Sequence, residues 1–142
     1  MSKIHPFFEK FIIFWFPVIV WAFLIFTFSS ATLPKVGATY WPDFFAKKTA
    51  HVIEYAILSI LLYRALKNSG VKKEKAMIYS VLVAFVYAIT DEMHQSFIPV
   101  RTPKVRDVII DTLGAGFSVF CIWKLLPKAP KKLRILAESF HL

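Results

Sequence analysis

The sequence predicts an all-α, polytopic membrane protein that folds as a bundle of four transmembrane helices. Of its 142 residues, 57% are hydrophobic and the mean hydropathy is +0.57, whereas a soluble domain is roughly 45–50% apolar. Four apolar segments approach the ~20 residues that cross a hydrocarbon core. Breakers rich in Pro, Gly and Lys separate these segments, so we expect a single membrane domain over residues 1–142.

The first expected span covers about residues 11–31 and contains Pro17, which a membrane helix tolerates. The other three expected spans cover about residues 49–66, 76–97 and 107–126, and a basic tail follows at 127–142. The small residues Ser29–Ala31 resemble a signal-peptide cleavage site. The first apolar stretch is nevertheless longer than the usual ~7–15 residues of a signal peptide, so we expect an uncleaved anchor.

The distribution of Lys and Arg predicts how the bundle is oriented. With four spans, twelve of the 18 basic residues lie on the side of the two termini, and six lie on the other side. The positive-inside rule therefore predicts both termini in the cytoplasm of a bacterial cell. Most acidic residues lie on the opposite, outer side, where the start of span two, the end of span three and the start of span four should meet.

Helical spacing gathers the polar residues of these three segments into one expected binding site. Lys48, His51 and Tyr55 are spaced by three and four residues, and so share one face of the second span. The full set of expected ligand-binding residues is Lys48, His51, Tyr55, Asp91, Glu92, Gln95, Arg101, Asp107 and Asp111. Ionisable groups are costly in hydrocarbon, which indicates that these side chains face one another across the bundle.

The cost of placing charged groups in hydrocarbon predicts specific ion pairs between these side chains. We expect Lys48 to pair with Asp91 or Glu92, His51 to contact a carboxylate, and an arginine of segment 101–106 to contact another. The four tryptophans, in contrast, should face lipid or the membrane interface, where this residue is enriched. They are Trp15, Trp21, Trp41 and Trp123.

Several other classes of protein fit the sequence poorly. The net charge is +9, but the basic residues cluster beside the apolar runs, as membrane topology requires, so we expect no nucleic-acid partner. The single Cys121 cannot form an internal disulfide. The motifs His51-x-x-Glu54 and Glu92-x-His94 match neither zinc-protease nor di-iron patterns, and we expect neither a metal nor a cofactor.

The polar positions together resemble a known family. The sequences "KKTAHVIEYAILSILLYRAL" and "VYAITDEMHQSFIPVRTPKVRDVIIDTLGAG" resemble the VanZ-like family of small membrane proteins, and so does "FSSATLP" at the end of span one. The resemblance covers about residues 25–120. Val100 stands where the family often has Gly, and Asp111 where it often has Asn. The resemblance implies a role in the cell envelope, since the family's namesake is linked to teicoplanin resistance in Gram-positive bacteria.

Three functions fit these observations. The first is binding of a membrane lipid or lipid-linked envelope precursor at the outer polar site, with a lowered effect of the antibiotic. The second is a membrane-embedded hydrolase or transferase, for which the candidate catalytic residues are His51, Asp91, Glu92 and Asp107. The third is a small transporter or flippase, in which intramembrane acids would relay protons. Four short spans would then need a homodimer to provide alternating access.

Overall fold

The computed structural model describes residues 6–30, 40–98 and 104–142. Within these ranges every regular element is a helix, and four helices are long and apolar enough to cross a membrane. The candidate spans are Phe8–Ser30, Phe44–Asn68, Lys73–Gln95 and Val105–Lys128. The prediction of an all-α bundle with four transmembrane helices is confirmed.

The helices follow one another with short connections. In chain order they are α1 (Pro6–Lys10), α2 (Phe16–Ser30), α3 (Tyr40–Asn68), α4 (Lys73–Gln95), α5 (Val105–Phe120) and α6 (Lys131–Ser139). A π-helical turn at Phe11–Trp15 joins α1 to α2, so the first span is one continuous rod. A second π-helical turn at Cys121–Leu125 extends α5.

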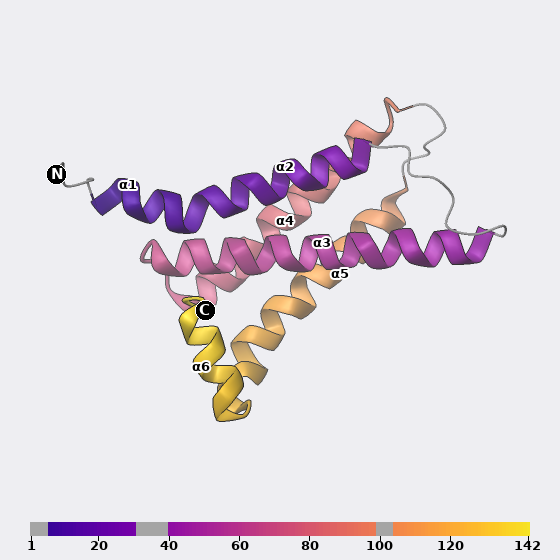
Figure 1. Cartoon of the computed structure of the whole chain (residues 1–142). Coiled ribbons are helices and arrows are strands. Elements are labelled where there is room, and N and C mark those ends of the chain that lie inside the picture. The colour runs from indigo at the N-terminus through magenta and orange to yellow at the C-terminus, as the bar shows by residue number, and fades with distance from the viewer. Residues whose placement is uncertain (1–5, 31–39, 99–103) are drawn as a thin grey trace.

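The long helix α3 forms the axis of the bundle (Figure 1), and its most extensive contacts are with α5, followed by α4. The first span runs alongside α3, whereas α5 crosses α3 and diverges from it toward the C-terminal end of α5. The chain then turns back through α6, which lies across the end of the bundle at which α3 ends. The end of α4 and the start of α5 consequently lie together at the opposite end of the bundle.

Small side chains allow these helices to pack closely. Ala65, Ala84 and Ala115 are completely buried, as is Ser59, whose hydroxyl donates to the Ala115 carbonyl of α5 at 3.0 Å. Small residues at helix interfaces are the usual means by which membrane helices approach one another. The larger apolar side chains instead point outward: Leu113 and Phe117 are 67% and 69% exposed, as expected for a surface that faces lipid.

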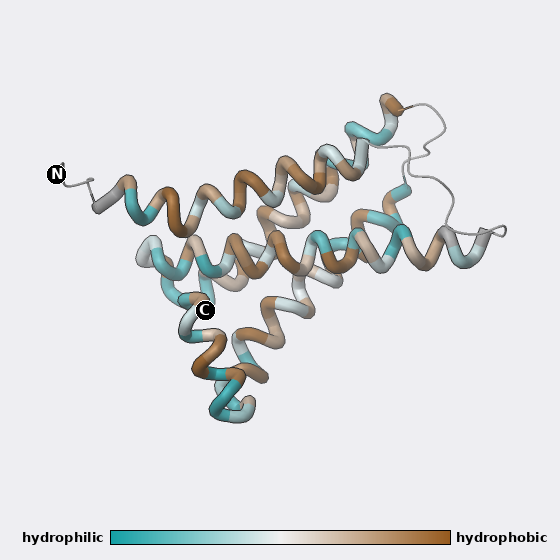
Figure 2. Tube along the Cα trace, in the orientation of Figure 1, coloured by the Kyte–Doolittle hydropathy of each residue, from teal (hydrophilic) through white to brown (hydrophobic). Residues whose placement is uncertain are grey.

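The hydropathy pattern gives the bundle two polar ends. In Figure 2, hydrophilic residues gather where the end of α4, the start of α5 and the adjoining part of α3 meet, and a second group lies around α6. Brown, hydrophobic segments occupy the middle of the first span and of α5. This arrangement is typical of a membrane protein whose polar groups lie at the two interfaces.

Pro17 breaks the backbone hydrogen bonding of the first span. Proline has no N–H, so the Ile13 carbonyl lacks its usual partner four residues later. Arg64 of α3 donates to this carbonyl from Nη1 at 3.1 Å. The proline therefore creates a polar anchor point between the first two spans.

Two helix boundaries differ from those expected. Helix α3 begins at Tyr40, well before the expected span start at Thr49, because the charges of segment 43–48 mark the end of the apolar run but do not end the helix. The basic tail expected at 127–142 contains a further helix, α6. At the other end of α3, Gly70 adopts a positive φ of 93°, and the Val71 amide donates back to the Leu66 carbonyl, which closes the helix as in a Schellman motif.

Candidate functional site

Three helices bring acidic side chains together at the end of the bundle where α4 ends and α5 begins. We call this group the acidic cluster. It consists of Glu54 from α3, Asp91 and Glu92 from α4, and Asp107 and Asp111 from α5. Asp91 and Asp111 are each only 4% exposed, and the charges of Asp91, Glu92 and Asp107 all act on Asp111.

Lys48 is the cation of α3 that faces this cluster. Its Nζ lies 2.5 Å from Asp107 Oδ2, and the two side chains are only 18% and 14% exposed. The expected pairing of Lys48 with Asp91 or Glu92 is therefore wrong, because the close packing of α3 against α5 brings Asp107 nearer. The charge of Lys48 still acts on Glu92 and Asp111, so a single ammonium group influences several carboxylates.

Glu92 connects the end of α4 to the start of α5. Its Oε1 accepts a hydrogen bond from the backbone N–H of Lys104 at 2.5 Å, and Lys104 is the N-cap residue of α5. A carboxylate at a helix N-terminus is favoured by the helix dipole. Arg106 lies on the same first turn and places Nε 3.6 Å from Oδ1 of the adjacent Asp107, so this contact lies within α5, whereas the contact of an arginine with a carboxylate was expected across the bundle.

Asp91 belongs to a buried chain of hydrogen bonds that reaches the first span. Gln95 Nε2 donates to Asp91 Oδ2 at 2.9 Å and to Ser29 Oγ at 2.8 Å. All three side chains are buried. Ser29 was not among the expected site residues, although it lies in the last turn of α2, at the same end of the bundle as the cluster.

His51 and Tyr55 form the α3 wall of the cluster. His51 Nδ1 lies 3.6 Å from Glu54 Oε2, one turn along the same helix, so this contact lies within α3, whereas a contact of His51 with a carboxylate was expected across the bundle. Tyr55 is completely buried, and its hydroxyl lies within range of the charges of Asp91 and Asp111.

Buried polar atoms at the centre of the cluster have no hydrogen-bond partner among the described residues. They include the Tyr55 hydroxyl, Asp91 Oδ1, Asp107 Oδ1 and Asp111 Oδ1. Buried polar atoms are normally paired, so this group of atoms is a candidate for binding or proton transfer. Arg101, the remaining expected site residue, lies outside the described residues.

A different contact set involves His94 and Trp21. His94 Nε2 lies 2.9 Å from Ser30 Oγ, and its ring packs on Phe26 at 4.3 Å, so His94 faces the first span. Trp21 Nε1 donates to the Glu54 carbonyl at 2.9 Å. The expectation that the tryptophans face lipid or the interface is wrong for Trp21, because its half-buried indole joins the first span to α3.

The sequence of this four-span chain matches the model of a known protein family. The family model described as VanZ/LLP1 matches residues 14–126, a range that holds the whole acidic cluster, the second and third spans and most of the first and fourth. The chain belongs to the VanZ/LLP1 family. Comparisons with curated proteins and with solved structures gave no match.

A groove of about 590 Å³ lies beside the acidic cluster of this VanZ/LLP1 protein, between α4 and α5. Its walls are mainly apolar, and Glu92, Ser96 and Lys104 give it a polar end. The apolar lining residues are Phe85, Ile89, Met93, Val105, Val108 and Ile109. The groove therefore has apolar walls along most of its length and charged residues at one end. Glu92 lines the groove and also belongs to the acidic cluster.

The chemistry available to this VanZ/LLP1 site comes from carboxylates, one lysine, a histidine and a tyrosine. Among the described residues, no three His, Cys, Asp or Glu side chains are arranged to hold a metal ion. Ionisable groups with burial and specific neighbours are frequent at functional sites. The arrangement is suited to binding a polar group or to transferring a proton at the edge of the membrane.

Proposed function

We propose that the protein binds an amphiphilic or lipid-linked envelope molecule at the outer leaflet of the bacterial cytoplasmic membrane, and that this binding lowers the effect of teicoplanin-type antibiotics. The groove between α4 and α5 is the observation that carries the proposal. Its apolar walls and its polar end match the two-part chemistry of an amphiphile. Membership of the VanZ/LLP1 family supports the link to the envelope and to glycopeptides.

The apolar part of the ligand would lie along the groove. Ile89 of α4 and Val108 of α5 both line it, and Ile109 is 53% exposed, so an acyl or isoprenoid chain in the bilayer can reach these residues without crossing the protein. At 590 Å³, the groove lies within the roughly 300–1,000 Å³ typical of ligand sites.

The polar head would lie at the end of the groove next to the acidic cluster. Lys104 provides a positive charge there, and we expect Arg101 to add a bidentate contact with a phosphate or carboxylate. Glu92, Gln95 and His51 would orient the head by hydrogen bonds. Both termini would be cytoplasmic in this arrangement.

Photo-crosslinking tests the apolar half of the proposal. The protein in lipid nanodiscs is exposed to a photoreactive polyprenyl diphosphate, and the labelled fraction is measured by mass spectrometry. Ile109→Trp should reduce labelling about tenfold or more, because the indole fills the groove. Leu113→Trp is the matched control, since Leu113 lies one turn further along α5, is 67% exposed and does not line the groove; it should label like the wild type. Equal labelling of the two variants would exclude the groove as the binding site.

Arg101→Ala tests the polar half. The variant should bind the same probe more weakly, and cells that carry it should lose protection against teicoplanin, while Arg101→Lys should retain part of both. An Arg101→Ala protein that is folded in the membrane, yet binds and protects like the wild type, would contradict the assigned role of Arg101.

A second function, acid/base catalysis on a lipid-linked substrate, is supported by the buried polar atoms without partners at Tyr55, Asp91 and Asp111. In this hydrolase or transferase, His51 and Glu92 would exchange protons with the substrate. Purified protein would then turn over a lipid-linked diphosphate, and Glu92→Gln or His51→Asn would abolish the activity. Turnover that is unchanged in both variants would remove these residues from the chemistry.

A further inference from the structure

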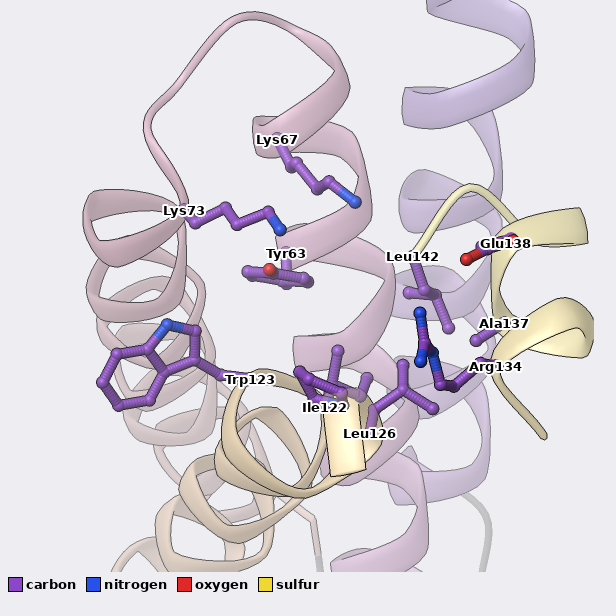
Figure 3. Close-up of a pocket in the computed structure, with 11 residues that line it drawn as sticks. Tyr63, Lys67, Lys73, Ile122, Trp123, Leu126, Arg134, Ala137, Glu138 and Leu142 are labelled. Carbon is purple, nitrogen blue, oxygen red and sulfur yellow. The ribbon is translucent and has the colours of Figure 1, made fainter. Parts of the chain in front are cut away.

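A second polar cavity lies at the opposite end of the bundle, where α3 ends, α4 begins and α6 crosses them (Figure 3). Its volume is about 200 Å³. Tyr63 and Lys67 of α3, Lys73 of α4, Trp123 after α5 and Arg134 of α6 line it, so four separate parts of the chain contribute to one site. This cavity shares no residue with the groove or with the acidic cluster.

The side chains that line the cavity carry a net positive charge, although Glu74 lies close enough to act electrostatically on Tyr63. Lys67, Lys73 and Arg134 contribute three positive charges, and Glu138 is the single acidic side chain in the lining. No carboxylate within the described ranges lies at ion-pair distance from any of the three basic groups. Lys67 and Lys73 also act on each other electrostatically, and like charges held near each other destabilise the fold unless an anion lies between them.

The shape of the cavity fits a small anionic group. Figure 3 shows the ammonium groups of Lys67 and Lys73 near the Tyr63 ring, while the Arg134 guanidinium lies on the other side of the cavity next to Leu142. Tyr63 is only 2% exposed and forms an aromatic wall. The volume is below the roughly 300 Å³ at which sites for drug-sized ligands begin, which favours a compact headgroup or ion.

Helix α6 is held in place, so Arg134 is part of a built site. Arg64 Nε donates to the Phe140 carbonyl at 2.6 Å, and Asn68 Nδ2 donates to the His141 carbonyl at 3.0 Å. Helix α6 also exposes Leu133 and Ile135, one on each side of Arg134 in the sequence. Amphipathic, basic helices commonly lie in the plane of the membrane interface, and α6 in that position would bring the cavity to the depth of the lipid headgroups.

We propose that this cavity binds a phosphate-bearing anion through Lys67, Lys73 and Arg134, either as the headgroup of an anionic phospholipid or as a soluble phosphate. The three cations surround a volume of headgroup size, and basic pockets between transmembrane helices bind anionic headgroups in this way. The proposal is independent of the ligand at the acidic cluster.

A lipid titration tests the proposal. The full-length protein is reconstituted in phosphatidylcholine with increasing phosphatidylglycerol, and bound phosphatidylglycerol is counted by native mass spectrometry. A lysine near an anionic headgroup contributes about fivefold in affinity, so Lys67→Gln combined with Lys73→Gln should weaken binding about 25-fold. The matched control combines Lys128→Gln with Lys132→Gln, two exposed lysines at the same end of the molecule that do not line the cavity; it should bind like the wild type.

Thermal unfolding separates binding from misfolding. In phosphatidylcholine alone, the Lys67/Lys73 double variant should melt at or above the wild-type temperature, because a like-charge repulsion is removed. In phosphatidylglycerol it should melt below the wild type, because only the wild type gains from the bound lipid. If the double variant cannot be purified, Arg134→Gln at an exposed position tests the same reversal.

A parallel arm identifies the source of the phosphate. Inorganic phosphate added to protein in phosphatidylcholine, compared with chloride at equal ionic strength, raises the wild-type melting temperature only if a soluble phosphate binds; a rise with phosphatidylglycerol alone assigns the lipid. Stabilisation by neither anion would overturn the proposal. Equal weakening in the cavity variant and in the Lys128/Lys132 control would also overturn it, since that result means diffuse surface attraction.

Discussion

Lys48 has an unusual position among the ionisable residues of this protein. It forms an ion pair with Asp107, and its charge also acts on Glu92 and Asp111. The carboxylates around it repel one another, so the ammonium group stabilises more than its direct partner. Loss of the cation and loss of its partner should therefore have different consequences.

Lys48→Gln is expected to destabilise the protein more than Asp107→Asn. The first change removes a positive charge from a group of five acids and should cost about 3 kcal/mol, as for other buried pairs that lose one partner. The second change leaves Lys48 among the remaining acids and also removes a repulsion, so its cost should be about 1 kcal/mol. Unfolding in detergent micelles, followed by circular dichroism, measures both. A larger loss for Asp107→Asn would contradict the central role of Lys48 in the cluster.

At the residue scale, the sequence predicts the end of the bundle at which a polar residue lies better than it predicts the residue with which it pairs. Helical spacing and the distribution of charges were sufficient to expect Lys48, Asp91 and Asp111 at one end of the bundle. They could not predict that Lys48 pairs with Asp107, because that choice depends on how α5 is rotated against α3. Ser29 was missed for another reason: an uncharged hydroxyl at the end of an apolar span carries no signal in composition or charge.

Gly114 of α5 shows how closely α3 and α5 approach each other where they cross. A Cβ atom added at Gly114 would lie 3.0 Å from the Val52 carbonyl oxygen and 3.0 Å from Val52 Cγ1. Backbone cannot move aside as a flexible side chain can. In contrast, a Cβ at Gly116, half a turn away on the same helix, meets no atom within 4 Å.

Gly114→Ala should therefore separate α3 from α5 and destabilise the bundle by about 1–3 kcal/mol, the usual range for overpacking. Gly116→Ala should be neutral or stabilising by about 0.5–1 kcal/mol, because alanine is the better helix former. Both variants are compared by thermal unfolding in the same detergent. Similar losses in the two variants would show that the crossing does not depend on the missing side chain at position 114.

At the element scale, the four spans were predictable because hydrophobic length is a strong signal, and the ends of the helices were not. Helix α3 continues through charged residues to Tyr40, since polar residues can extend a helix into the interface. Helix α6 was not predicted, because the expectation for residues 127–142 went no further than a basic tail. The signal for a helix was the spacing of Leu133 and Leu136, which lie three residues apart with Arg134 between them.

The whole molecule has an apolar exterior and two polar ends of different character. The acidic cluster occupies one end, and the basic cavity with α6 occupies the other. Under the positive-inside rule, this asymmetry predicts an orientation in which the basic end lies in the cytoplasm and the acidic cluster faces outward.

Cysteine labelling tests the orientation. In a Cys121→Ala background, Phe97→Cys, which is 83% exposed after α4, should react with a membrane-impermeant maleimide on intact spheroplasts. Ser69→Cys, at the exposed turn after α3, should react only after the membrane is permeabilised. The reverse pattern would contradict the orientation and would place the proposed amphiphile site at the cytoplasmic surface.

Arg64 has a consequence for how the protein is made. The same guanidinium donates to the Ile13 carbonyl at the start of the first span and to the Phe140 carbonyl after α6, and it lies over the Phe14 ring. These two partners are far apart along the chain, so Arg64 can complete both contacts only after the first span and α6 have been synthesised. Assembly of this end of the bundle therefore cannot be completed before α6 is in place.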